Sequence, residues 1–243
     1  MKKYLQHIQF LLLIVLIGFL YGFAANRNSE RKNSDVKIVF KNGGSLFVSY
    51  ETVNKLLIQN LGPLENQAKE NINLNNAEQF VEKNQMIENA EIYQTINGEL
   101  GVVITQRTPV LRVSNDLGSC YYDKHGEKMP LSENFSARIP LTTSKLDKEN
   151  CKDIICLANK IKNDDFLKKQ IIGINQIEGL KSNQFELKTR VGDQVIIFGD
   201  LQRMESKIKN LKVFYQKIMS DGTLNNYKTI NLKFNNQVVC AKF

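Results

Sequence analysis

A long uncharged stretch near the N-terminus limits what this chain can fold into. From Phe10 to Ala25, the sequence FLLLIVLIGFLYGFAA holds sixteen residues without a charge, and extending it back to Tyr4 gives twenty-two. Since an α-helix rises about 1.5 Å per residue, roughly twenty such residues cross the hydrocarbon layer of a membrane. We therefore predict a transmembrane helix over residues 8–25. It follows a short cytoplasmic tail, residues 1–7, and leaves the large remainder exported.

A cleaved signal peptide is the alternative interpretation of the same stretch. Gly22, Phe23 and Ala24 follow the apolar core and place small residues at the two positions that a signal peptidase recognises. Lysines and arginines flank the stretch on both sides, so charge bias does not fix its orientation. The membrane anchor is the prediction that we carry forward. N-terminal sequencing would separate the two, because a mature N-terminus near Ala25 would mean that the anchor has been removed.

The chain after residue 25 divides by its patterns into a linker and two units. A polar linker, residues 26–35, shows no periodicity. The first unit, residues 36–106, has the pattern strand, helix, helix, strand, strand, and Asn75 is the predicted N-cap of its second helix. Its predicted elements are VKIVF (Val36–Phe40), Tyr50–Leu61, a helix to about Asn84, AEIYQTI (residues 90–96) and LGVVITQ (residues 100–106), with Asn97-Gly98 as a hairpin turn.

The second unit, residues 107–243, is richer in strands. Its segment CYYDKHGEKMPLS indicates a hairpin that turns at Asp123–Gly126. Two helices are predicted, over Cys151–Ile161 and over Leu201–Met219, where apolar residues recur at three-four spacing. Strands are predicted at QRTPVLRV, IIGINQIEG, QFELKT, QVIIFGD and YKTINLKFNNQVVCAKF. The fold class is therefore α+β: one transmembrane helix, a β-α-α-β-β domain, and a mixed β-rich domain that ends in an edge strand.

The last predicted strand carries an unusual pattern on both faces. Its apolar residues at even positions indicate one face on a core, and its odd positions begin polar and become apolar from Val239 to Phe243. Either an earlier segment of the chain or another molecule must cover this apolar end, and the pattern alone does not decide between them. The even-position residues are Ile230, Leu232, Phe234, Val238 and Cys240.

The sequence does not favour catalysis, a cofactor or a metal. It has no GxSxG, HExxH, glycine-rich phosphate loop or Cys/His cluster, and its four cysteines are expected to be buried free thiols with pairing left open. The net charge of +8 comes from basic residues interspersed with acidic ones, and no recognition motif points to nucleic acid. We expect neither an enzyme nor a small-molecule substrate, and a binding function instead.

Several segments, taken in order, resemble known families. The first unit, just after an anchor, resembles the polypeptide-transport-associated (POTRA) module. Together with RTPVLRV, YYDKHGEKMP, RIP, FELKTRVGDQVIIFGD, KIKNLKVFY and YKTINLKFNNQVV, the chain resembles the bacterial cell-division family FtsQ/DivIB, and its closing segments are most similar to Bacteroidetes-type members. The resemblance covers nearly the whole chain.

The resemblance implies a bitopic inner-membrane protein with its N-terminus in the cytoplasm and its body in the periplasm at the division septum. Such proteins recruit the coiled-coil division proteins FtsB and FtsL, and through them act indirectly on the septal peptidoglycan synthase. The family's last strand pairs with a segment of FtsB and carries a Leu-basic-aromatic sequence. The implied partner-binding residues are Ile230, Leu232, Lys233, Phe234, Asn236, Gln237, Val238 and Val239.

This chain departs from the family pattern at two places. Better-known members have small residues after the aromatic, where Asn236 and Gln237 stand here, and a basic residue before the last helix, where this chain has Asp200 with Arg203 nearby. The alternative function is a POTRA-bearing periplasmic chaperone or outer-membrane assembly factor. That alternative predicts further POTRA repeats or an array of barrel strands, and this sequence shows one such unit.

Overall fold

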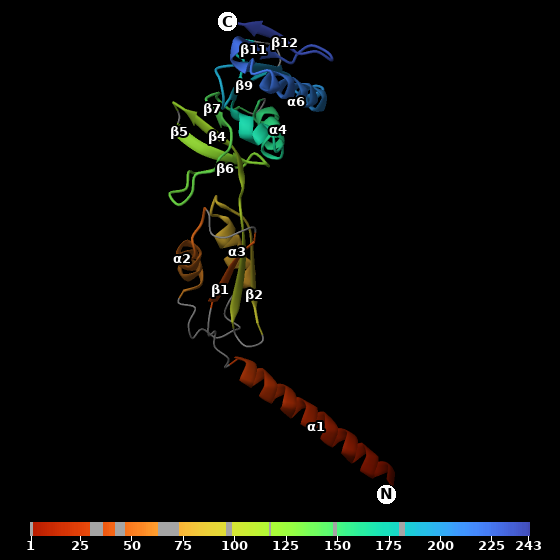
Figure 1. The fold of residues 1–243 in the computed structure, drawn as a ribbon. Helices are drawn as coiled ribbons and strands as arrows, with labels where there is room; N and C mark the ends of the chain where they lie inside the picture. The colour runs from red at the N-terminus through yellow and green to blue at the C-terminus, as the bar shows by residue number, and fades with distance from the viewer. Residues whose placement is uncertain are drawn as a thin grey trace. The chain divides into compact units, whose positions relative to one another are not determined.

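The computed structural model describes residues 2–29, 36–41, 47–62, 73–95, 99–116, 118–147, 150–179 and 183–243 (Figure 1). These residues form two compact units, Met1–Gln106 and Arg107–Phe243, and each is described by itself. Helix α1 spans Lys2–Ser29, so it extends beyond the predicted residues 8–25 and includes the first four residues of the predicted linker. The rest of the linker lies outside the described residues.

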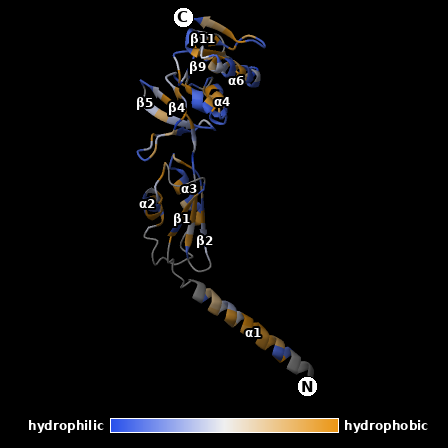
Figure 2. Cartoon of the chain, in the orientation of Figure 1, coloured by the Kyte–Doolittle hydropathy of each residue, from blue (hydrophilic) through white to orange (hydrophobic). Residues whose placement is uncertain are grey.

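Helix α1 is apolar over most of its length (Figure 2). Within it, His7–Asn26 forms a stretch of 20 residues with a mean hydropathy of 2.4, and none of its most apolar window is buried. Among the described residues this is the one helix long and apolar enough to cross a membrane. A helix of this length and composition is long enough to cross the hydrocarbon layer of a membrane.

The first unit has the predicted order of elements. It consists of β1 (Val36–Lys41), α2 (Tyr50–Leu61), α3 (Leu74–Glu82), β2 (Ile87–Gln94) and β3 (Leu100–Gln106). The strands form a sheet in the order β1-β3-β2, in which β3 pairs parallel with β1 and antiparallel with β2. The predicted β-α-α-β-β domain is therefore confirmed. Its core forms where alternate strand residues meet the apolar stripes of the two helices.

The start of α3 differs from the prediction. Asn73, and not Asn75, is the N-cap, and its side-chain oxygen accepts a hydrogen bond from the Asn76 N–H at 3.1 Å. Three asparagines lie within four residues here, and spacing alone did not show which one precedes the first helical turn. The predicted Asn97-Gly98 turn lies outside the described residues.

The second unit is built on a nine-stranded sheet in the order β12-β11-β10-β9-β8-β7-β4-β5-β6. Three of its elements, β7, α5 and η2, were not among the predicted ones. The strands are β4 (Pro109–Asn115), β5 (Gly118–Asp123), β6 (Lys128–Met129), β7 (Leu141–Thr142), β8 (Ile171–Gln176), β9 (Phe185–Thr189), β10 (Val195–Gly199), β11 (Tyr227–Asn231) and β12 (Val239–Lys242). The helices are α4 (Cys151–Lys162), α5 (Leu167–Gln170), η2 (Leu224–Asn226) and α6 (Met204–Ser220).

Helices α4 and α6 pack against this sheet and close its core (Figure 1). Ile208, Leu211, Tyr215 and Ile218 of α6 are buried, as their three-four spacing predicts. The helix begins at Met204, three residues later than predicted, because Arg203 adopts a left-handed conformation with φ 56°. The apolar pattern continues back to Leu201, but the backbone before Met204 is a turn.

The four cysteines are free thiols. Cys120, Cys151 and Cys240 are half-buried and pack against the core, and Cys156 is exposed, so the expectation of a buried thiol is wrong at Cys156. Cys156 lies on the outer side of α4, between the buried Ile155 and Leu157, where neighbouring residues point in different directions around the helix.

Candidate functional site

The C-terminal segment is a β-hairpin, and the prediction of one long strand there is wrong. Strand β11 ends at Asn231, β12 begins at Val239, and the two pair antiparallel. The chain reverses through Asn236, whose φ of 56° is left-handed. Asparagine adopts this conformation more easily than most residues, because its short side chain forms local hydrogen bonds. Apolar residues recur at even positions on both sides of the turn, so the sequence pattern gave no sign that the strand is interrupted there.

Strand β12, and not β11, borders the sheet. β11 lies between β10, which it pairs with in parallel, and β12. The first half of the predicted edge is thus already paired within the domain. The predicted β-rich domain that ends in an edge strand is confirmed, with Val239–Lys242 as that strand.

Two hydrogen bonds fix which backbone groups of β12 face outward. The Leu232 N–H donates to the Ile197 carbonyl of β10 at 2.9 Å, so Asn231, one residue earlier, faces β12. The Phe243 N–H donates to the Asn226 carbonyl at 3.3 Å, so Phe243 faces the β11 side. Because successive residues of a strand direct their amide groups to opposite edges, Cys240 and Lys242 present their N–H and C=O groups away from the sheet.

The predicted partner-binding residues separate into a buried and an exposed group. Ile230 and Leu232 are 0% and 2% exposed and belong to the core, so their side chains are not accessible to a partner. Val238 is half-buried and packs against the same core. The exposed residues lie in the turn and on β12; they are Lys233, Phe234, Asn236, Gln237 and Val239.

Exposed apolar side chains accompany this edge. Phe234 is 46% exposed, Val239 is 41% exposed and Phe243 is 76% exposed. Val239 and Phe243 are on the same face of the strand, because their positions differ by an even number. Phe243 was absent from the predicted site, although the apolar odd positions at the chain's end were the signal that could have included it.

A group of charges adjoins the turn of the hairpin. Lys207 is 4% exposed; its Nζ donates to both the side-chain Oδ1 and the carbonyl oxygen of Asp200, at 2.8 Å each, and lies over the Phe198 ring. The hydrogen bond from Lys207 holds the pKa of the Asp200 carboxyl below its ordinary value. Arg203 donates from Nη2 to the Lys233 carbonyl at 3.3 Å. Since Lys207 neutralises Asp200, Arg203 and Lys233 leave this corner positive.

The other borders of the two sheets offer less to a guest strand. Strand β6 has only two residues. Strand β2 has its outward amides occupied, because Glu82 accepts from the Ala90 N–H at 3.0 Å and Glu78 from the Ile92 N–H at 2.7 Å. Strand β1 borders its sheet beside β3 and carries exposed lysines at Lys37 and Lys41, and lysines on a border strand disfavour pairing with another strand. β12 combines outward backbone groups with exposed apolar side chains.

Comparison with protein families identifies both units. A POTRA-like domain model matches residues 32–105. A model described as FtsQ/DivIB, C-terminal related, matches residues 108–241, which is more than half of the chain. The chain belongs to the FtsQ/DivIB family. No curated protein matches the chain.

FtsQ/DivIB proteins are non-enzymatic scaffolds of cell division, so this chain is a division-related periplasmic scaffold. Family membership and the apolar helix α1 fit a single-pass membrane protein. The family model includes the whole of β11 and most of β12, which places the hairpin inside the family's own domain. Among the described residues, no group of three or more His, Cys, Asp or Glu side chains is placed to hold a metal ion.

Proposed function

We propose that this FtsQ/DivIB protein binds an FtsB-like division protein by strand addition at β12. In this proposal α1 spans the inner membrane with its N-terminus in the cytoplasm, and the two units lie in the periplasm at the septum. The observation that carries the proposal is the outermost strand β12, whose Cys240 and Lys242 direct their backbone groups away from the sheet. A guest strand would pair with these groups and extend the sheet.

The exposed apolar residues supply the second part of the interaction. A guest strand beside β12 would cover part of Phe234, Val239 and Phe243, which are otherwise in water. Burial of apolar area contributes roughly 25 cal/mol per Å², so aromatic side chains dominate such contacts. The positive corner at Arg203 and Lys233 favours an acidic residue on the partner.

The membrane anchor α1 would strengthen a contact as small as the one that β12 offers. A strand of four residues offers few hydrogen bonds, and each is worth about 1 kcal/mol net. Partners tethered in the same bilayer meet at a high effective concentration, so individually weak contacts suffice. An FtsL-like protein in a coiled coil with the FtsB-like partner would join the same assembly, and the septal synthase would be reached through them.

The Phe234→Glu substitution tests the apolar contact. We expect it to weaken binding of an FtsB-like peptide about thirtyfold, since loss of an aromatic anchor costs about 2 kcal/mol and the new carboxylate would be desolvated. Fluorescence anisotropy of the labelled peptide against the full chain in nanodiscs measures the effect. Phe135→Glu is the matched control, because Phe135 is 37% exposed in the same unit and away from the hairpin. Equal losses in both variants would contradict the proposal.

The role in division is tested in cells. Depletion of the protein is expected to give filaments, because a scaffold is needed before the septal synthase can act. Loss of outer-membrane proteins without filaments would instead indicate the assembly-factor alternative. The FtsQ/DivIB match over residues 108–241 supports the first outcome.

A further inference from the structure

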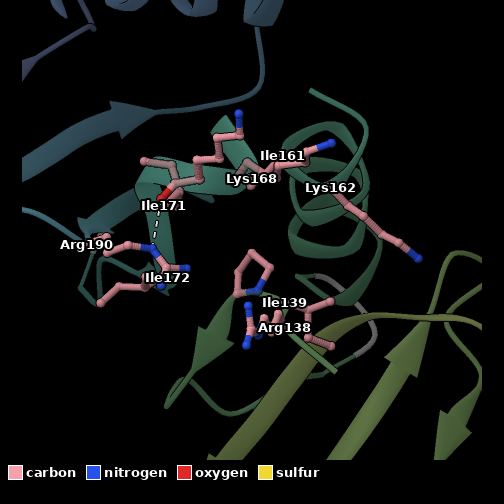
Figure 3. Close-up of a pocket in the computed structure, with 10 residues that line it drawn as sticks. Arg138, Ile139, Ile161, Lys162, Lys168, Ile171, Ile172 and Arg190 are labelled. Atoms are coloured by element: carbon pink, nitrogen blue, oxygen red, sulfur yellow. Dashed lines mark hydrogen bonds between the residues drawn. The ribbon is translucent and has the colours of Figure 1, made fainter. Parts of the chain in front are cut away.

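A cavity of about 900 Å³ opens on the second unit (Figure 3), and none of its lining residues belongs to the C-terminal hairpin. It is formed by the segment before β7, the end of α4, the short helix α5, the start of β8 and the residue after β9. Its lining residues are Arg138, Ile139, Pro140, Ile161, Lys162, Lys168, Lys169, Ile171, Ile172 and Arg190. Five of these ten carry a positive charge and none carries a negative one.

Two of the five cations are directed to the cavity. In Figure 3 the guanidinium groups of Arg138 and Arg190 lie toward its middle, whereas the ammonium groups of Lys162 and Lys168 point away from it. The two lysines have partners of their own. Lys162 donates to the Pro109 carbonyl at 3.0 Å, and Lys168 forms an ion pair with Asp165.

The two arginines are held differently. The Arg190 Nε donates to the Lys169 carbonyl at 2.8 Å, and its backbone N–H donates to the Gln170 carbonyl at 2.7 Å, which fixes where the side chain leaves the backbone. Arg138 makes no hydrogen bond or ion pair with the residues that the structure describes. One arginine is therefore oriented in advance and the other is free to adjust. A guanidinium binds a carboxylate through two parallel hydrogen bonds.

The floor of the cavity is apolar and its size exceeds that of a small anion. Ile139, Pro140, Ile161, Ile171 and Ile172 supply this floor, and Ile172 is 41% exposed. Pockets of roughly 300–1,000 Å³ accommodate several side chains or a drug-sized molecule, and a single phosphate would leave most of the aliphatic surface wet. The arrangement suits a ligand with an aliphatic part beside negative charges.

We propose that this cavity binds a short acidic peptide segment of another protein. A carboxylate of the segment would pair with Arg190, a second with Arg138, and an aliphatic side chain between them would contact Ile172. The cavity borders β8, which is four strands from β12, or roughly 19 Å at the usual strand spacing. The scaffold would thus hold a second partner while β12 is occupied.

The test uses the full chain in nanodiscs of zwitterionic lipid and a fluorescent seven-residue peptide of alternating glutamate and leucine. Binding is expected to weaken about tenfold in the double variant Arg138→Glu, Arg190→Glu, since two attractive pairs become repulsive. The matched control is Lys152→Glu with Lys209→Glu, which makes the same change of charge at exposed positions on α4 and α6. It is expected to bind within about twofold of the unchanged chain, and a peptide of alternating lysine and leucine is expected not to bind.

Each alternative ligand gives its own result. Equal weakening in both double variants would mean that overall charge, and not this cavity, attracts the peptide, and would overturn the proposal. So would arginine-dependent binding of phosphatidylglycerol vesicles without peptide binding, which would indicate a membrane surface. Inorganic phosphate that displaces the peptide at equal concentration would indicate a site for a simple anion. Phe234→Glu is expected to leave this binding unchanged, so failure here is distinguishable from failure at β12.

Discussion

Replacement of Cys240 by proline is expected to weaken binding of an FtsB-like peptide about hundredfold. Cys240 directs its N–H away from the sheet, so proline removes a donor to the guest strand without removing a hydrogen bond between β11 and β12. The ring also occupies the space that the guest backbone must enter. A lost ladder bond together with this clash costs about 3 kcal/mol, which is about hundredfold in affinity. Anisotropy of the labelled peptide against the full chain in nanodiscs measures it.

Two neighbouring variants separate the backbone effect from other causes. Cys240→Ala removes the thiol but keeps the outward N–H, and we expect nearly unchanged binding. Ala241→Pro removes an N–H that faces β11, so we expect it to disturb the hairpin itself and to increase amide hydrogen exchange in β11. The proposal fails if Cys240→Pro binds the peptide as tightly as Cys240→Ala while hydrogen exchange shows an intact hairpin.

Much of the fold was predictable from local sequence patterns, because its helices and strands are periodic and bounded by turn residues. The helix over Tyr50–Leu61 has its predicted bounds, and the strand over Leu100–Gln106 does as well. Both elements combine periodic apolar residues with a clear boundary. For the helix this boundary is Gly62, whose φ of 76° ends it. The short strands were harder to predict. Leu141–Thr142 has two residues and depends on β4 and β8 on either side, and no local pattern reports such partners.

The sequence indicated β-structure at the C-terminal segment but did not show its turn. Alternation located the C-terminal segment, yet the same period ran through the turn at Asn236 and joined two strands into one. Ile230 and Leu232 were named as partner-binding residues from the family resemblance, whereas their even positions had indicated the core face, where the structure places them. The cavity at Arg138 and Arg190 was missed altogether, because its residues come from four separate segments of the chain. Tertiary structure alone brings those charges together.

Loss of the Asp123 carboxylate is expected to give the largest loss of stability in the second unit. Asp123 is 1% exposed, and its Oδ2 accepts from Arg107 Nη1 at 2.8 Å. Its Oδ1 accepts the backbone N–H groups of His125 and Glu127, each at 2.8 Å, which orders the turn between β5 and β6. Asp123→Ala removes these bonds at once and leaves Arg107 without this counter-ion. We expect a loss of about 4 kcal/mol in the free energy of unfolding, as for other broken buried ion pairs.

Hydrogen exchange of β4 and β5 measures this loss. The chain has no tryptophan, so tryptophan fluorescence is not an available probe of unfolding. Glu127→Ala is the matched control: Glu127 lies in the same turn, its side chain is exposed, and its backbone N–H remains to donate to Asp123. We expect this variant to stay within about 0.5 kcal/mol of the unchanged chain. A loss of similar size in both variants would show that the turn, and not the carboxylate, is responsible.

The same carboxylate predicts how the unit responds to acid. Burial alone would raise the pKa of Asp123. The hydrogen bonds from Arg107, Glu127 and His125 together lower this pKa by more than burial raises it, so it lies below its ordinary value of 3.8. A group whose pKa is lower in the folded state stabilises the fold above its unfolded pKa, and this stabilisation is lost as the pH falls through the folded pKa. The free energy of unfolding should therefore fall as the pH drops below about 3.8. Asp123→Asn has no proton to take up at this position, so its stability should fall less over that range, and an equal fall would assign the acid response to other groups.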